Sequence, residues 1–256
     1  MNNYERKKLI EKILREREFV TVNELAKLIF ASEATVRREL TEMQNEGVVR
    51  RTHGGASISQ ITQDESAYSA RDRMMKPQKR AIAAECAKRI GEGSSVFLDS
   101  SSTVGSIIPF LAEKKNLSVL TNGIRTALEI SRFGNIEVFV IGGKLLPNSN
   151  SIIGATTLSS LKNFCFDFAV LSASGLNESG VFTDFNAEQS ELKKAAAAEA
   201  VKTFMLVDSS KVGETFMNKT FTPTDVDELF TDKPLSDKLS LLFENHGCAV
   251  NICDKK

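Results

Sequence analysis

Residues 21–55, TVNELAKLIFASEATVRRELTEMQNEGVVRRTHGG, contain the pattern that decides the fold of the N-terminal part of the chain. Thr21 and Glu24 have the spacing of a capping box, which predicts that a helix begins just after Thr21. Ser32 is expected to cap the next helix after a short turn. The buried face of that helix is predicted from residues that recur at helical spacing: Val36, Leu40 and Met43. Gly47 follows this apolar pattern and is expected to end that helix.

The sequence on either side completes a small domain. Residues 4–17 place their apolar side chains on one face of a helix. Residues 48–53 form a short basic strand, and Gly54 and Gly55 turn the chain after it. Three short helices followed by a basic strand and a tight turn describe a winged helix-turn-helix, which we assign to residues 1–57.

The side of the third helix opposite its buried face carries hydrogen-bonding side chains. Arg38 is suited to the edge of a guanine, where its guanidinium can donate two hydrogen bonds. Ser32 and Thr35 lie at the expected helix start, which suits phosphate oxygens. The helices alone leave two alternatives open, a protein-binding three-helix unit and a solvated charged face. The predicted DNA-contacting residues are Ser32, Thr35, Arg37, Arg38, Thr41, Arg50, Arg51 and His53.

Charge is divided unevenly between the two ends of the chain. The 256 residues contain 33 Lys and Arg and 33 Asp and Glu, so the net charge is zero. Residues 1–90 hold 18 basic and 13 acidic residues, a net charge of +5, and residues 91–256 hold 15 and 20, a net charge of −5. The excess is small, and it fits a chain whose N-terminal part alone meets a polyanion such as double-stranded DNA.

Composition argues against several classes of protein. Hydrophobic residues make up 41% of the chain, which is enough for a real core. The sequence has no apolar run of about 18 residues and no apolar stretch after its first charges, so we expect neither a membrane-spanning helix nor a signal peptide. Four cysteines do not make a disulfide framework, so we expect a cytoplasmic chain with reduced thiols. Cys248 and Cys253 lack the partners of a zinc site, and two histidines are too few for a nucleophile–His–Asp set. We therefore expect no metal, no cofactor and no catalytic residue.

The chain after residue 57 is predicted to contain a linker and a larger domain. Residues 58–76 are expected to be the linker, because their first part is polar and has no clear period. A basic helical stretch runs from Arg71 to Arg89 and is expected to break at Pro77. Short apolar runs then alternate with helical segments through residues 77–256, which predicts a mostly parallel α/β sheet. The predicted strands are 96–98, 117–120, 136–141, 168–171, 204–207, 228–230 and 248–252.

Polar and small residues follow several of these strands. Ligands gather at the carboxyl ends of strands in open α/β sheets, so we expect an anion site there. Asp99–Thr103 is a hydroxyl-rich loop before a helix and suits a phosphate, although a plain polar turn with an N-cap explains the same residues. Lys211 would pair either with an anionic ligand or with Asp208. The expected effector-binding residues are Asp99, Ser100, Ser101, Ser102, Thr103, Thr121, Asn122, Gly142, Gly143, Lys144 and Lys211.

Two further features near this expected site have alternative interpretations. Gly142 and Gly143 permit a close backbone approach to a ligand, or they form a tight turn. A helix is predicted for residues 186–201 and carries Glu188 and Glu191 in its first turns. The sequence leaves open which of these two carboxylates, if either, contacts a ligand, because a solvated helix face explains both.

Three stretches of the N-terminal part match the pattern of a known family. Residues 24–26 read ELA, residues 32–40 read SEATVRREL, and residues 47–56 read GVVRRTHGGA. With this spacing the chain resembles the DeoR family of bacterial transcription regulators. The resemblance implies an operator-binding winged helix-turn-helix in which the two adjacent arginines of the second stretch lead recognition. Glu39 stands where the family usually has Asp, keeps the charge, and is expected to matter little.

The resemblance covers nearly the whole chain. It implies that residues 77–256 are a sensor domain related in fold to ribose-5-phosphate isomerase and that this domain binds a phosphorylated sugar or a similar metabolite. Ser101 stands where the family pattern D-x-G-x-T has Gly, and Gln189 stands where a Glu is common. Positions 121–122, 142–143 and 208–211 match the family pattern.

These patterns together predict a repressor of a carbohydrate uptake or catabolism operon. It is expected to act as a homodimer or homotetramer on double-stranded operator DNA, with its DNA affinity altered by a phosphorylated sugar. The competing hypothesis is a sugar-phosphate isomerase with an appended DNA-binding head. That enzyme would need a poised carboxylate base, for which Asp99, Glu188 and Glu191 are the candidates. A third reading is an interaction module that does not bind DNA.

Overall fold

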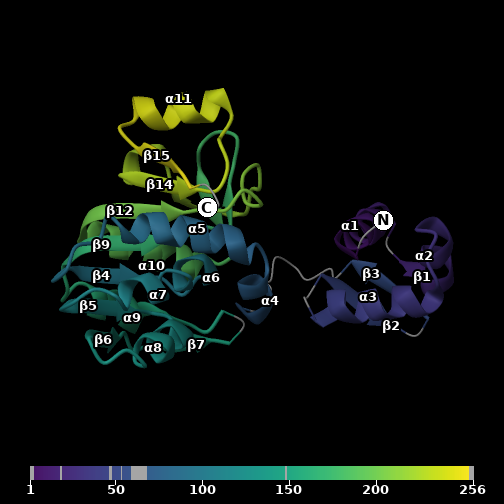
Figure 1. The fold of residues 1–256 in the computed structure, drawn as a ribbon, viewed down its shortest axis with the longest axis horizontal. Coiled ribbons are helices and arrows are strands. Elements are labelled where there is room, and N and C mark those ends of the chain that lie inside the picture. The colour runs from purple at the N-terminus through teal and green to yellow at the C-terminus, as the bar shows by residue number, and fades with distance from the viewer. Residues whose placement is uncertain are drawn as a thin grey trace. The chain divides into compact units, whose positions relative to one another are not determined.

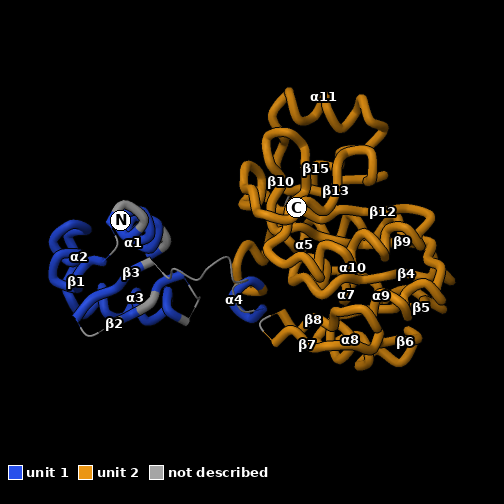
Figure 2. The backbone as a smooth tube through the Cα atoms, turned by 180° about the vertical axis from the view of Figure 1, so that it is seen from behind, with its two compact units in different colours: residues 1–71 blue, residues 72–256 orange. Residues whose placement is uncertain are grey.

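The chain forms two compact units, residues 1–71 and residues 72–256, which are coloured separately in Figure 2. The structure is a computed structural model that describes residues 3–17, 19–45, 48–52, 54–58, 68–147 and 149–253. Gly47, the predicted contact residue His53 and most of the predicted linker lie outside the described residues.

The N-terminal unit has the predicted winged helix-turn-helix fold (Figure 1). Its elements are α1 (Asn3–Glu16), β1 (Val20–Thr21), α2 (Val22–Leu28), α3 (Glu33–Asn45), β2 (Val49–Thr52) and β3 (Gly55–Ile58). The strands pair antiparallel in the order β1–β3–β2. β2 is the predicted basic strand, and Gly54 turns the chain into β3 with φ of +94°, a left-handed conformation that glycine adopts without steric cost.

Local signals in the sequence explain where these helices begin and what they bury. The Thr21 hydroxyl accepts from the Glu24 N–H, and the Glu24 carboxylate accepts from the Thr21 N–H, so the predicted capping box is formed. The Thr35 N–H donates to the Ser32 hydroxyl at 3.2 Å, which confirms Ser32 as the cap of α3. The predicted inward residues of α3, Val36, Leu40 and Met43, are buried in one core together with Val22, Leu25 and Ile29.

Two helices with a break between them lie where the end of the linker and the basic helical stretch are predicted. Helix α4 (Tyr68–Arg73) occupies part of the stretch expected to be a linker. Helix α5 (Lys76–Ala87) has Pro77 in its first turn, and the predicted break in the helical stretch lies at residues 74–75, directly before this helix. A proline is tolerated there because its missing N–H would have no partner within the helix.

The second unit is built on a seven-stranded parallel sheet, as predicted (Figure 1). The strand order is β15–β14–β12–β9–β4–β5–β6, so the chain starts in the middle of the sheet and builds outward. The strands are β4 (Ser95–Leu98), β5 (Leu117–Thr121), β6 (Ile136–Val140), β9 (Phe166–Leu171), β12 (Ala200–Leu206), β14 (Glu228–Thr231) and β15 (Ala249–Ile252). Every strand predicted from the apolar runs belongs to this sheet.

Helices cover both faces of the sheet, which is why its strands are apolar throughout. One core lies under α5, α6 (Ser102–Gly105), α7 (Ile108–Leu111) and α8 (Ile124–Ile130). The other lies under α9 (Ala155–Leu161), α10 (Ala187–Ala198) and α11 (Asp237–Asn245). The predicted helix over residues 186–201 is shorter than expected, because β12 begins at Ala200 and includes Val201.

Two small antiparallel sheets were not predicted. A hairpin pairs β7 (Lys144–Leu146) with β8 (Ser151–Ile153), and a second sheet joins β10 (Gly175–Leu176), β11 (Phe182–Asp184) and β13 (Asn218–Phe221). The 3₁₀ turn η1 (Pro223–Asp225) follows β13. These strands have two to four residues and mixed polarity, so they show no period that a sequence pattern can identify.

No helix of the described residues has both the length and the apolar character that a crossing of a lipid bilayer needs.

Candidate DNA-binding and effector sites

The outer face of α3 presents the predicted DNA-contacting residues to solvent. Arg37, Arg38 and Thr41 are exposed, and the Ser32 and Thr35 hydroxyls lie 2.9 Å apart at the helix start. Arg37 pairs with Glu33 one turn away at 3.2 Å, an exposed ion pair that solvent weakens. Their contact with DNA stays a prediction.

A hydrogen bond joins α3 to the strand that follows it. Arg51 Nη1 donates to Thr41 Oγ1 at 2.6 Å, and the same hydroxyl donates to the Arg37 carbonyl at 2.7 Å. The structure therefore brings Thr41 and Arg51 of the predicted set together. Arg50 lies on β2 beside Arg51.

Glu39 has a structural role that the sequence did not show. Its side chain is fully buried, and Arg6 Nε and Nη2 both donate to its Oε1 at 2.8 and 2.6 Å. This ion pair ties α1 to the recognition helix α3. The hydrogen bond also raises the pKa of Arg6 above its usual value. Glu39 faces inward, away from the predicted base-reading face, as expected. The side chain nevertheless matters for the structure, because it holds α3 in place.

In the second unit, two lysines converge on the hydroxyl-rich loop after β4. Lys211, from the loop after β12, donates through Nζ to Thr103 Oγ1 at 3.2 Å and to Ser172 Oγ at 2.8 Å. Lys79, from α5, donates through Nζ to Ser102 Oγ at 3.0 Å and is 4% exposed. We call Lys79, Ser102, Thr103, Ser172 and Lys211 the lysine–hydroxyl cluster. The sequence leaves two partners open for Lys211, an anionic ligand and Asp208. The two bonds from Lys211 to hydroxyls of this cluster fit the first of these, an ammonium placed at a ligand site.

Asp99 holds this loop in shape. Its Oδ1 accepts from the Ser101 N–H at 2.7 Å, and its Oδ2 accepts from the Ser172 N–H at 2.8 Å. Ser101 caps the following helix by accepting from the Val104 N–H. That helix is only one turn long, so the positive end of a helix dipole adds less than the sequence suggested. A carboxylate engaged through both oxygens is a structural anchor and is poorly placed as a general base.

The end of β5 lies against the same loop. A side chain at Gly123 would come within 3.0 Å of the Ser100 backbone, so glycine permits this close approach. Thr121 Oγ1 donates to the Leu98 carbonyl at 2.7 Å, which gives Thr121 a structural role. Asn122 donates through Nδ2 to Ser151, while its buried Oδ1 has no hydrogen-bond partner. An unsatisfied buried acceptor is rare and suits a ligand hydroxyl.

The hairpin β7–β8 carries the remaining predicted residues. Gly143 has φ of +153°, and a side chain there would collide with Thr157 Oγ1 at 2.0 Å, so this glycine permits the close approach of α9. Gly142 is exposed and has open space around it. Lys144 is exposed and lies 3.5 Å from the Glu188 carboxylate. Glu188 therefore has a lysine partner within the chain, and Glu191 is exposed.

A second buried ion pair was missed by sequence reasoning. Lys193 Nζ donates to Asp184 Oδ1 at 2.8 Å, and both side chains are buried. Asp184 also accepts from the Ser174 N–H and from Thr220 Oγ1. Gln189, which lies one turn before Lys193, donates through Nε2 to Ser149 Oγ at 2.9 Å. The bonds of Asp184 fix α10 to the small sheet β10–β11–β13. The bond of Gln189 joins α10 to the loop between β7 and β8, with the amide as a neutral donor.

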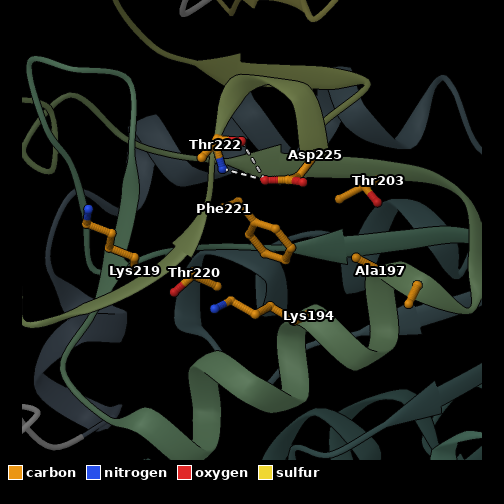
Figure 3. Close-up of a pocket in the computed structure, with 9 residues that line it drawn as sticks. Lys194, Ala197, Thr203, Lys219, Thr220, Phe221, Thr222 and Asp225 are labelled. Carbon is orange, nitrogen blue, oxygen red and sulfur yellow. Dashed lines mark hydrogen bonds between the residues drawn. The ribbon is translucent and has the colours of Figure 1, made fainter.

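Figure 3 shows a separate groove between α10, β12, β13 and η1. Lys194, Lys219, Phe221 and Asp225 line it, and Thr222 donates to the Asp225 carboxylate through its N–H and its hydroxyl, both at 2.7 Å. None of the predicted effector residues lines this groove, so it is distinct from the lysine–hydroxyl cluster.

Cysteine chemistry contributes to neither site. Cys86, Cys248 and Cys253 are buried, and Cys165 is exposed; none is in a disulfide. Burial raises the pKa of Cys248 to about 12 and that of Cys253 to about 11, and it raises the pKa of Cys86 well above its usual value. Within the described residues, no group of three or more His, Cys, Asp or Glu side chains is placed to hold a metal ion.

Comparison with known proteins covers both units. A DeoR-like helix-turn-helix domain matches residues 6–62, and a DeoR C-terminal sensor domain matches residues 75–233. The HTH-type transcriptional regulator GolR of Listeria innocua is 30% identical over 98% of this chain and 99% of its own length. The glycerol-3-phosphate regulon repressor of Escherichia coli is 26% identical over 99% of this chain and 100% of its own length.

Among solved structures, ribose 5-phosphate isomerase A from Methanocaldococcus jannaschii aligns with a TM-score of 0.39 and 16% identity, over 52% of this chain and 53% of that one. A likeness this coarse implies nothing about activity. The two relatives are named as a regulator and as a repressor, and neither is named as an enzyme. With the helix-turn-helix and the sensor domain both matched, the chain belongs to the DeoR family of DNA-binding transcriptional regulators.

Proposed function

We propose that this chain represses a carbohydrate uptake or catabolism operon and that a phosphorylated sugar bound in the second unit changes its affinity for operator DNA. Family membership supports the repressor role. The name of the E. coli relative refers to the glycerol-3-phosphate regulon, which links that relative to a phosphorylated polyol. The finer statement rests on the chemistry of the lysine–hydroxyl cluster.

The observation that carries this proposal is the convergence of Lys79 and Lys211 on adjacent hydroxyls. Ser102 and Thr103 each accept from a different lysine, although the two lysines are 132 positions apart in the chain. A phosphate would form charge-assisted hydrogen bonds to both ammonium groups, which are stronger than their present bonds to neutral hydroxyls. Two buried oxygens without a hydrogen-bond partner, Asn122 Oδ1 just after β5 and Thr126 Oγ1 in the first turn of α8, suit the hydroxyls of a sugar.

The position of Lys79 suggests how the ligand would act on the rest of the chain. Lys79 lies on α5, and α5 follows α4, which leads out of the N-terminal unit. A phosphate that draws Lys79 away from Ser102 would shift α5. Because α4 precedes α5, ligand binding would then be linked to the position of α4. By linkage, operator DNA and sugar phosphate then change each other's affinity by the same factor.

We further propose that the chain works as a homodimer or homotetramer through the edge strand β6. An unpaired strand edge favours association with another copy. Antiparallel pairing of two β6 strands about Val138 would place Glu137 opposite Phe139 and would avoid a clash of like charges. Large apolar side chains are exposed on β6 and on the segments next to it: Leu128, Phe133, Phe139, Val140 and Leu145.

Sedimentation velocity of the Val140→Lys variant tests this surface. The variant is expected to sediment as a smaller species, because each lysine would enter an apolar interface. Val201→Lys is the matched control, since Val201 is 77% exposed on β12, away from β6. Unchanged association of Val140→Lys would refute the β6 surface and leave DNA binding untouched.

The repressor proposal is tested by DNA binding to a duplex from upstream of the chain's own operon, with and without a panel of pentose and hexose phosphates. We expect one phosphorylated sugar to change the affinity and its unphosphorylated form to have no effect. Each sugar phosphate is also assayed for turnover. Turnover without DNA binding would contradict the proposal.

A further inference from the structure

Phe30 occupies a backbone position that normally takes glycine. It follows the C-cap of α2 with φ of +52°, in the left-handed region. The next residue, Ala31, donates its N–H to the Ala26 carbonyl at 3.0 Å. That bond is the long hydrogen bond of a Schellman motif, in which the residue at the position of Phe30 must be left-handed. A bulky residue is strained there, and glycine is not.

The Phe30 side chain is also almost fully exposed. It is 96% accessible, the highest value among the exposed large hydrophobic residues of the described chain. The ring therefore makes almost no contacts within the protein that would offset the strain. Of the three other described non-glycine residues with positive φ, Asn116 and Asn150 are asparagines, which tolerate this conformation, and Met75 is half-buried, so Phe30 alone combines this conformation with an exposed bulky side chain. A strained outlier without internal contacts points to a function outside the folded chain.

The surroundings of Phe30 show what kind of partner it faces. It lines a shallow polar hollow together with Arg6, Ser32, Thr35 and Arg38. Arg38 of α3 and the two hydroxyls at the start of that helix can donate to a polyanion, and Arg6 of α1, which also pairs with Glu39, adds positive charge beside them. In a helix-turn-helix the first helix crosses the DNA backbone and the second enters the major groove. The turn that joins them therefore lies where the sugar–phosphate backbone passes.

We propose that Phe30 is a DNA-contacting residue that packs its ring on a deoxyribose at the edge of the groove, between the phosphates held by its polar neighbours. The contact is apolar, since the carbon face of the sugar offers C–H groups and no charge. In the free protein the turn is strained and the apolar ring is exposed to water. Both costs are then offset when DNA covers the ring. The inference rests on the DNA-binding function and adds a residue that sequence reasoning did not include.

The test compares Phe30→Gly with the wild-type chain, both at full length. Glycine relieves the strain, so we expect hydrogen exchange of the amides in residues 22–45 to slow by a few-fold. DNA binding is expected to weaken in the same variant by about tenfold. The loss should be equal on the upstream duplex and on a random-sequence duplex of the same length, because a deoxyribose carries no sequence information. The salt dependence of binding should not change, because no charge is removed.

Two control variants separate this inference from its alternatives. Phe30→Tyr keeps the ring and is expected to bind like the wild type. Leu28→Ala removes another exposed apolar side chain of α2, 40% accessible and outside the hollow, and is expected to change nothing. Faster exchange in Phe30→Gly would show a structural role and overturn the inference.

Slower exchange with unchanged affinity would also overturn the inference, as would a loss confined to the upstream duplex, which would indicate a base contact. If Arg38→Ala weakens binding while Phe30→Gly does not, the DNA-binding function stands and the inference about Phe30 fails. If the wild type binds neither duplex, the DNA-binding function itself fails.

Discussion

Arg38 of α3 and Lys79 of α5 carry the same charge in opposite surroundings. Arg38 is exposed and lies on a surface that is complete before any partner arrives. Lys79 is buried, and its ammonium already donates to Ser102. DNA can therefore bind to the N-terminal unit without rearranging it. A ligand of the second unit must exchange internal hydrogen bonds for its own, and this exchange is what can change the conformation of the sensor.

The largest expected effect concerns Arg38, the exposed residue of the two. Arg38→Ala should weaken binding to the upstream duplex by about tenfold or more. If the guanidinium neutralises a phosphate, the slope of log affinity against log salt should also fall by about 1. Fluorescence anisotropy over a salt series measures both quantities. Lys202→Ala removes the same charge from an exposed site on β12 and should have no such effect. Equal losses in the two variants would mean that net charge alone drives binding.

Lys79, the buried residue of the two, should control the affinity for the ligand and not the affinity for DNA. Lys79→Met and Lys211→Met should each weaken binding of the selected phosphorylated sugar by about tenfold, because each removes a charge-assisted bond to phosphate. Calorimetry measures the affinity, and DNA binding without sugar should stay the same. Lys144→Met is the matched variant, since Lys144 already pairs with Glu188. A larger loss for Lys144→Met would move the phosphate to the hairpin β7–β8.

Two of the described ion pairs between α1 and α3 sharpen the comparison between buried and exposed charge. Glu39→Gln weakens a pair in which the carboxylate is fully buried, and its unfolding temperature should fall by several degrees. Glu42→Gln weakens the pair with Lys7, in which the carboxylate is 40% exposed, and should change the unfolding temperature little. Thermal unfolding of both variants gives the difference. Similar unfolding temperatures for the two variants would contradict the assignment of Glu39 as the residue that anchors α3.

The smallest effect is a pH dependence at the start of α2. Hydrogen bonds from the Thr21 N–H and hydroxyl hold the pKa of Glu24 below its usual value of 4.5. The folded-state pKa is below the unfolded-state pKa, so the carboxylate adds stability above pH 4.5, and this stability is lost as the pH falls through the folded-state pKa. Urea unfolding should show Glu24→Gln slightly less stable at neutral pH. The gap should close in acid, and a constant gap would contradict this assignment.

The N-terminal unit was largely predictable because its signals are local. Thr21, Glu24 and Ser32 are caps whose partners lie three residues away, and the apolar period of α3 is contained within the helix. The main sheet was predictable for a similar reason, since a strand buried on both faces is apolar along its length. Strand β13 pairs with β11, which lies far from it in sequence, and β10 has only two residues, so no local pattern reveals either strand.

The sensor cluster was only half predictable. Lys211 and the loop at Ser102 and Thr103 were expected from their places after strands, but Lys79 was not. A signal for it existed: Lys79 lies three and seven positions before Ile82 and Cys86, on the buried face of α5. A lysine at a core position needs a partner, and only the fold shows that this partner is Ser102. The burial of Glu39 was hidden in the same way, because Arg6 lies 33 residues away.

The four cysteines differ in burial, so one of them can serve as a specific attachment site for a spectroscopic label. Only thiolate reacts quickly with maleimides, and burial keeps Cys86, Cys248 and Cys253 protonated at neutral pH. Cys165 is solvent-accessible and precedes β9, a central strand of the sheet. A dye attached there would label the native chain at a single position without any engineered cysteine, and its emission could follow sugar binding in real time.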